Sequence, residues 1–454
     1  MGIVLLILAV AVPFRAASRS LGRGFVATLA VGYLSGVIRA NALSVPTTFL
    51  FDGAVLGLYL GDYAGPGRPA EARRPGAAGG FVLFLILWPA LLSLVPVNDF
   101  LVQLVALRAT VWFLPVLLIA RRLTPDDLSV MARGLAALNL VALAGGLYVY
   151  AFGVEALYPM NSVTRIIYLS RDVMNFEYHR IPSFFLSAHA YGGTMLLTLP
   201  FLFDRVAGPG VRPADRVLAA VGVAAAVGGL LMCGARLPLV LLLAGLAMAW
   251  PLSRFSPALG LLGALVIGAG LWVAGSNERL QRALSLADTD YVSSRIAGSA
   301  NASFLDLVGE YPLGAGMGSS IGTSIPYFLA DVAPEQVGLE NEFCRILIDQ
   351  GWVGLGAWLA FVGWLYLRPP PAGPPGPWRI GAVFMYSLTL ANWMTAFIGT
   401  GMLSSVPASF LLVTQMGVLV GVRDRRGAIG PARAGAGHRA ARTSGGPPRR
   451  RVVG

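Results

Sequence analysis

The sequence has no lysine, only two cysteines and few charged residues of any kind. All 34 basic residues are arginine, and charged residues make up 12% of the 454-residue chain, whereas a soluble domain carries about 25%. Cys233 and Cys344 are too few for a disulfide framework. With 56% hydrophobic residues and a mean hydropathy of +0.70, this composition excludes an ordinary soluble domain.

Several motifs that would indicate a cofactor are also missing. The chain has no zinc-ligand spacing, phosphate-binding loop, hydrolase nucleophile elbow or carboxylate cluster, so we expect neither a metal nor another cofactor. Gly314, Gly316 and Gly318 mimic a dinucleotide fingerprint, but no strand precedes them. We interpret them as a flexible turn in which two backbones approach closely.

Long apolar runs are abundant, and they predict an all-α, polytopic transmembrane helical bundle of about 12–14 spans. The expected spans lie near residues 1–14, 25–38, 48–60, 80–96, 100–120, 131–153, 183–203, 217–234, 237–251, 256–274, 342–367, 380–398 and 404–421. No internal repeat is visible, which gives no support to an inverted-repeat transporter.

Most arginines fall in alternate loops, which the positive-inside rule assigns to the cytoplasm. The long loop 275–341 and the shorter loop 154–182 are then extracytoplasmic parts of a membrane domain over residues 1–422. Residues 423–454, rich in Arg, Gly and Pro, predict a disordered cytoplasmic tail that acts as a topology anchor or contacts anionic lipids. The net charge of +12 thus follows from topology and does not indicate nucleic-acid binding.

Two arginines at expected span ends are candidates for holding a phosphate group, because a guanidinium stays charged and matches phosphate oxygens. Arg236 follows Cys233-Gly234-Ala235, a tight-turn sequence, and Arg180 precedes Pro182, which suits the start of the next helix. Arg236 is equally explained by an arginine that reaches to the membrane surface. His179 is a candidate acid or base, although a loop histidine is more often incidental.

The polar sequence Glu340-Asn341-Glu342 opens the span near 342–367. Glu342 and Arg345 are i,i+3 neighbours that would pair on a helix and, with Asp349, form a structural strip. Glu340 has no helical partner in reach, so desolvation could raise its pKa toward that of a useful base. Within other spans, Asp52 and Arg108 are expected to pair with each other rather than to relay protons.

Four segments in this order resemble the superfamily of O-antigen ligases and O-antigen polymerases, over roughly residues 80–420. They are Arg180-Ile181-Pro182-Ser183-Phe184-Phe185, Gly234-Ala235-Arg236, Arg295 followed by Tyr311-Pro312-Leu313-Gly314-Ala315-Gly316, and Glu340-Asn341-Glu342-Phe343 followed by Gly351-Trp352-Val353-Gly354-Leu355. Ligases of the family have His-Asn where this chain has Glu340-Asn341, which favours the polymerase branch and puts the identity of the base in doubt.

The resemblance implies metal-independent glycosyl transfer at the outer face of the bacterial cytoplasmic membrane. The donor would be an oligosaccharide on undecaprenyl pyrophosphate, and the acceptor a hydroxyl of a second lipid-linked repeat unit. Arg180, Arg236 and Arg295 would stabilise the leaving pyrophosphate, and Glu340 would orient or deprotonate the acceptor hydroxyl. Asn341 would hold a sugar hydroxyl or cap the helix, while His179, Glu342 and Arg345 would contact the substrate.

A polymerase of this kind could also have a chain-length regulator as its partner. Two other functions stay open. A ligase would move finished glycan to a lipid or protein, and only the missing histidine argues against it. A flippase for lipid-linked glycans would place charged residues along mid-membrane helices and would show repeated halves, whereas here the charges gather near one mouth of the bundle.

Overall fold

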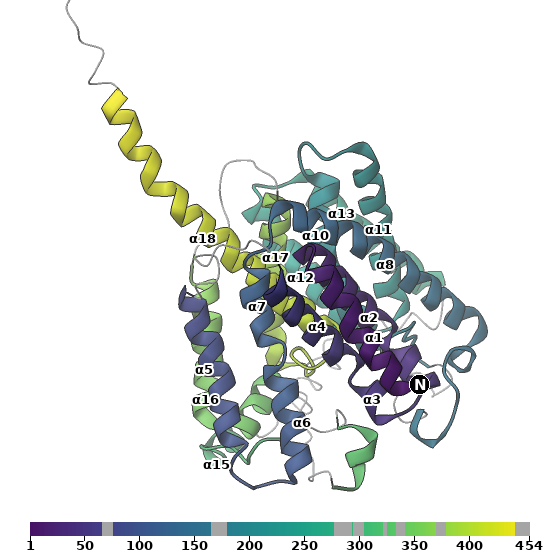
Figure 1. Ribbon diagram of the computed structural model, residues 1–454. Coiled ribbons are helices and arrows are strands. Elements are labelled where there is room, and N and C mark those ends of the chain that lie inside the picture. The colour runs from purple at the N-terminus through teal and green to yellow at the C-terminus, as the bar shows by residue number, and fades with distance from the viewer. Residues whose placement is uncertain are drawn as a thin grey trace, which may run out of the picture.

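A computed structural model describes residues 1–65, 76–164, 179–276, 293, 304–320, 325–332, 341–368 and 378–440, with side chains to Arg425. Every element within these ranges is a helix (Figure 1). The first half contains α1 (Gly2–Ala17), α2 (Leu21–Asn41), α3 (Val45–Thr48), α4 (Leu50–Ala64), α5 (Gly76–Leu92), α6 (Phe100–Val111), α7 (Leu114–Ala120), α8 (Pro125–Phe152) and the 3-10 helix η2 (Val154–Ala156). The second half contains α10 (Ala188–Ala207), α11 (Pro213–Met232), α12 (Arg236–Leu252), α13 (Pro257–Ser276), α15 (Phe304–Glu310), η6 (Tyr327–Val332), α16 (Glu342–Tyr366), α17 (Arg379–Met394), η7 (Thr395–Phe397) and α18 (Ala408–Ala440).

Six helical segments are long and apolar enough to cross a membrane, and the chain is a multi-pass membrane protein. They are Leu21–Asn41, Phe100–Ala120, Pro125–Phe152, Pro213–Met232, Glu342–Tyr366 and Arg379–Phe397. Among the shorter apolar helices, α1 precedes these segments in the chain, and α5 and α12 lie between them. The sequence therefore predicted the helical class and the membrane character correctly.

The central helix of the bundle is α10, which packs against α8, α11, α12, α17 and α18. Around it, α1 and α2 pack with α4, and α12 packs with α17. The pair α5 and α16 lies to one side, and α15 sits at its end (Figure 1). Phe51, Phe113 and Phe410 contact one another at ring-centroid distances of 5.6–6.4 Å, which joins α4, α7 and α18 in one core.

A fully buried polar chain links α2, α8 and α10. The Tyr33 hydroxyl donates to Asn139 Oδ1 at 2.7 Å, and Asn139 Nδ2 donates to Thr198 Oγ1 at 2.8 Å. All three side chains are at most 1% exposed. Because lipid offers no hydrogen-bond partners, polar groups at this depth must satisfy one another, and this chain fixes three helices in register.

The predicted pair of Asp52 and Arg108 is confirmed. Arg108 Nε and Nη2 donate to the two carboxylate oxygens of Asp52 at 2.6 and 2.5 Å. The guanidinium also lies 5.5 Å from the ring centroid of Phe49. This two-pronged geometry ties α4 to α6 and gives both charges a structural partner.

The helix α18 runs beyond Val422 to Ala440. Its first residues beyond Val422 contact the bundle. Arg423 donates to the Leu365 carbonyl, Asp424 pairs with Arg121 at 2.5 Å, and Arg425 donates to the Leu123 carbonyl at 3.2 Å. The arginines bind carbonyls left over at the ends of other helices, an attachment that composition does not reveal.

Candidate functional site

The bundle has two ends, which we name after the residues that flank α11. Arg212 precedes α11 and marks the Arg212 end, whereas Cys233-Gly234-Ala235-Arg236 follows it and marks the Arg236 end. The predicted tight turn is present: Gly234 has a φ of +67°, which favours glycine, and α12 begins at Arg236. Ala235 N donates to Cys233 Sγ at 3.4 Å inside this turn.

The segment that follows Arg180 is irregular and buried, which corrects the prediction that a helix begins at Pro182. The helix α10 begins at Ala188, where the Ser187 hydroxyl accepts from Ala190 N at 3.1 Å and caps it. Before the helix, Ile181 and Ser183 are at most 1% exposed. Irregular backbone at this depth is stable only when its polar groups find partners within the protein.

Those partners come from α2, α8 and the segment after η2. The carbonyl of Phe184 accepts from Val37 N at 3.1 Å. The Tyr158 hydroxyl bonds to the Ser183 and Phe185 carbonyls at 2.5 and 3.0 Å, and the Ser183 hydroxyl donates to the Ala142 carbonyl at 2.6 Å. The backbone next to Arg180 is thus rigidly placed, which the residue types alone did not indicate.

Arg180 contacts a histidine on the first turn of α10. Its Nη1 lies 2.6 Å from His189 Nε2. A guanidinium has donors only, so His189 Nε2 is the acceptor in this contact. His179, the candidate acid or base of the sequence analysis, is half-buried and directly precedes Arg180 in the chain.

The two predicted phosphate-binding arginines are connected through α10 and Cys233. Arg180 is an electrostatic neighbour of Cys233, at the start of the turn that leads to Arg236. A Cβ on Gly192 of α10 would lie 2.7 Å from Cys233 Sγ. The structure therefore brings Arg180 and Arg236, which are far apart in the chain, to the same end of the bundle.

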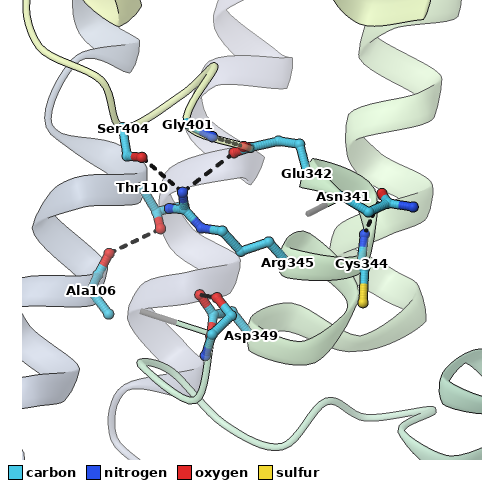
Figure 2. Close-up of polar contacts among 10 residues, drawn as sticks. Ala106, Thr110, Asn341, Glu342, Cys344, Arg345, Asp349, Gly401 and Ser404 are labelled. Carbon is cyan, nitrogen blue, oxygen red and sulfur yellow. Dashed lines mark hydrogen bonds and ion pairs between the residues drawn. The ribbon is translucent and has the colours of Figure 1, made fainter. Parts of the chain in front are cut away.

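The loop between η7 and α18 joins this turn to the start of α16. A Cβ on Gly399 would lie 2.8 Å from the Leu237 side chain, next to Arg236. The Gly399 carbonyl accepts from Glu342 N at 3.2 Å, and Gly401 N donates to Glu342 Oε2 at 2.7 Å (Figure 2). The Glu342 side chain is 1% exposed, so these bonds replace its hydration.

The predicted pairing of Glu342 and Arg345 is confirmed, with 3.6 Å between Oε1 and Nη1. Arg345 Nη1 also donates to Ser404 Oγ at 2.8 Å, so both residues hold the loop 399–404 (Figure 2). Asn341 caps α16 by accepting from Cys344 N at 3.0 Å, as one of its two predicted roles required. Asp349 bonds to Ser320 through both carboxylate oxygens, at 2.7 and 3.0 Å, a partner that the predicted strip did not include.

The predicted span near residues 342–367 is helical but broken. Gly351 has φ +66° and ψ −167°, so residues 342–350 form a short half-helix and the rest of α16 continues at a new angle. The sequence signal for this break is a group of three weakly hydrophobic residues inside an apolar run, Asp349-Gln350-Gly351. The buried Gln350 is 2% exposed at the same place.

The glycine turn after α15 fits into this break and confirms the predicted close backbone approach. Gly314, Gly316 and Gly318 all have positive φ. A Cβ on Gly314 would lie 2.9 Å from both Gly351 N and the Ile348 carbonyl oxygen. Side chains larger than hydrogen are therefore excluded where the two segments meet.

Two predicted catalytic residues, Glu340 and Arg295, lie outside the described residues. Within the described ranges, no three His, Cys, Asp or Glu side chains gather in a way that could hold a metal ion. No protein-family model and no curated protein sequence matches this chain.

Proposed function

We propose that the protein transfers a glycan from undecaprenyl pyrophosphate to a hydroxyl acceptor and thereby polymerises polysaccharide repeat units. One observation carries the proposal. Arg180, Arg236 and Arg345 come from three distant parts of the chain and lie at the Arg236 end: Arg180 near Cys233 of the turn before Arg236, and Arg345 bound to the loop 399–404, whose Gly399 approaches Leu237. Cationic groups at the mouth of a membrane bundle are costly, and by default they mark a functional site.

The chemistry suits such an arrangement. The bond between sugar C1 and the pyrophosphate oxygen breaks, and the pyrophosphate leaves with the electron pair. Fixed guanidinium groups stabilise that developing charge in a site from which water is largely excluded. We assign this role to Arg180, Arg236 and Arg295, and we assign substrate contacts to His179 and Arg345, whereas the buried Asn341 and Glu342 hold the start of α16.

Glu340 is the proposed base that takes the proton of the acceptor hydroxyl. It directly precedes Asn341, which caps α16, and Glu342, which is already engaged by Gly401. Of the two glutamates beside Asn341, Glu342 is thus bound to the protein itself, which leaves Glu340 as our choice for the acceptor. In this proposal the bundle crosses the bacterial cytoplasmic membrane 12–14 times and the Arg236 end faces outward.

A polymerase, a ligase and a flippase give different products in one assay. Purified protein in liposomes is incubated with a synthetic undecaprenyl-pyrophosphate repeat unit in the presence of a chelator, and products are resolved by gel and mass spectrometry. A ladder of repeat lengths supports the polymerase. A single transfer to an added acceptor supports the ligase.

The absence of any covalent product from the native repeat unit, with protein that is folded and monodisperse, would refute the transferase. Movement of the intact lipid-linked unit between leaflets would then support the flippase. In the same assay, Glu340→Gln should form less of the ladder than wild-type protein. A full ladder in this variant would assign the base to another residue.

A further inference from the structure

The break at Gly351 leaves backbone groups without their usual helical partners, and the turn 312–320 supplies them. Ala315 N donates to the Ile348 carbonyl at 2.7 Å, and Trp352 N donates to the Pro312 carbonyl at 2.9 Å. A third bond comes from the neighbouring helix α5, where Trp88 Nε1 donates to the Gln350 carbonyl at 2.9 Å. Unpaired groups at this depth would be costly, so these bonds stabilise the break itself.

A side chain reinforces the same attachment. Asp349 is 4% exposed and accepts from both the backbone N and the hydroxyl of Ser320. A buried carboxylate with two donors from one residue fixes the position of that residue closely. The turn 312–320 is therefore attached on both sides of the last residues of the half-helix.

The beginning of the half-helix is attached to a second segment. Glu342 N and the Glu342 carboxylate bond to Gly399 and Gly401, and Arg345 donates to Ser404. Nine residues, 342–350, are thus held at one end by the loop 399–404 and at the other by the turn 312–320. Arg345 lies between the two attachments, one turn before Asp349 (Figure 2).

We propose that the half-helix 342–350 is a positioning element for Arg345, with Gly351 and Asp349 as positioning residues that act through this guanidinium. The inference rests on the proposed function, in which Arg345 contacts the pyrophosphate-linked donor. A continuous helix would carry Arg345 along one fixed axis. The break lets the turn 312–320 set the direction of the half-helix independently of the rest of α16, as broken membrane helices do elsewhere.

Gly351 offers a sharp test because no other residue fits. Its φ is +66°, and an added Cβ would lie 2.5 Å from the Leu313 carbonyl carbon. Gly356 is the matched control: it lies in the same helix, and nothing stands within 4 Å of its added Cβ. Gly351→Ala should displace the half-helix, whereas Gly356→Ala should leave it in place.

The experiment is a double-mutant cycle on initial transfer rates in the polymer assay, with Arg345→Ala, Gly351→Ala and the double variant. A misplacement of about 1 Å can cost about 10²-fold in rate. We expect Gly351→Ala and Arg345→Ala each to lower kcat by about 10²-fold, and the double variant to lose little more, because both changes remove the same interaction. Losses that multiply in the double variant would overturn the proposal.

A second cycle keeps the test valid if Gly351→Ala does not fold. Ser320→Ala removes one hydrogen bond to Asp349 and retains the backbone bond. Its loss of about threefold to tenfold in kcat should disappear in the Arg345→Ala background. A loss of the same size in both backgrounds would contradict a role through Arg345.

The wild-type protein separates this inference from the proposed function. No ladder from wild-type protein refutes the transferase itself. If wild-type protein forms a ladder but the losses of the single variants multiply in the double variant, only the positioning role is refuted. Equal rates of Gly351→Ala and Gly356→Ala would also refute only the positioning role.

Discussion

The two ends of the bundle use arginine differently. At the Arg212 end, guanidinium groups join one helix to another: Arg122 pairs with Asp62 and Arg121 with Asp424, while Arg423 and Arg425 donate to backbone carbonyls. At the Arg236 end, Arg180 Nη1 lies 2.6 Å from His189 Nε2, and Arg345 donates to the Ser404 hydroxyl and pairs with Glu342 of the same half-helix at 3.6 Å. Pairs of opposite charge hold helices together. The arginine contacts at the Arg236 end instead join the starts of α10 and α16 to irregular segments, at Arg180 and at the loop 399–404.

The two ends of the bundle also differ in the regularity of their backbone. The Arg236 end contains the broken α16, the buried irregular segment before α10 and the glycine turn 312–320. In a membrane, such backbone needs many specific partners, which are costly to maintain. Its concentration at one end, together with the arginines, distinguishes this end from the other.

The largest effect is expected from the removal of Arg180. Arg180→Ala should lower the transfer rate by about 10²- to 10³-fold, the size seen when one fixed donor to a transition-state charge is lost. The measurement is the initial rate of ladder formation. Arg133, which is 46% exposed and pairs with Asp215 at the Arg212 end, provides the control Arg133→Ala, whose rate should stay near that of wild type. Equal rates for the two variants would remove the distinction between the ends.

A smaller loss is expected when the loop 399–404 is released. Glu342→Ala deprives Gly401 N of its acceptor and leaves Arg345 without its ion pair, so we expect a loss of about tenfold or more in kcat and of about 2 kcal/mol in stability. Glu342→Gln keeps the acceptor and should recover most of the stability. Thermal unfolding in detergent measures the stability of both variants. If the two variants were equally stable, the bond to Gly401 would not hold the loop.

At the Arg212 end the same kind of change should affect stability alone. Asp62→Asn removes the charge that pairs with Arg122, and both side chains are largely buried, at 13% and 14% exposed. We expect a loss of about 2 kcal/mol in the free energy of unfolding, with kcat unchanged in protein that remains folded. A large fall in kcat would show that this end contributes to the reaction.

The smallest effect concerns His189. His189→Gln offers a side-chain oxygen that can still accept from Arg180, so its rate should stay within about threefold of wild type. His189→Ala removes the acceptor and should cost about tenfold through a less well-placed Arg180. Transfer rates of both variants, measured over a range of donor concentrations, test whether His189→Ala loses more activity than His189→Gln. A loss in His189→Gln as large as in His189→Ala would indicate that the ring itself takes part.

Local chemistry was predictable from sequence wherever neighbours in the chain or the cost of burial decided the outcome. The i,i+3 pair of Glu342 and Arg345, the Asn341 cap and the tight turn at Gly234 follow from local geometry. The pair of Asp52 and Arg108 follows from the cost of isolated charges in a membrane.

Contacts between distant segments were not predictable in this way. The attachment of Asp349 to Ser320, the insertion of the turn 312–320 at Gly351 and the bond from Val37 N to Phe184 depend on how helices pack. Hydropathy also treats α16 as one span, because a single broken turn hardly changes an average over the whole segment.

The most direct test of the account is the release of undecaprenyl pyrophosphate by wild-type protein, Arg236→Ala and Arg212→Ala in parallel. Arg212 is 72% exposed and lies at the opposite end of α11, about 30 Å away by helical rise. We predict one undecaprenyl pyrophosphate released for each linkage formed by wild type and Arg212→Ala, and release near background by Arg236→Ala. Equal release by the two arginine variants would contradict the assignment of the reaction to the Arg236 end.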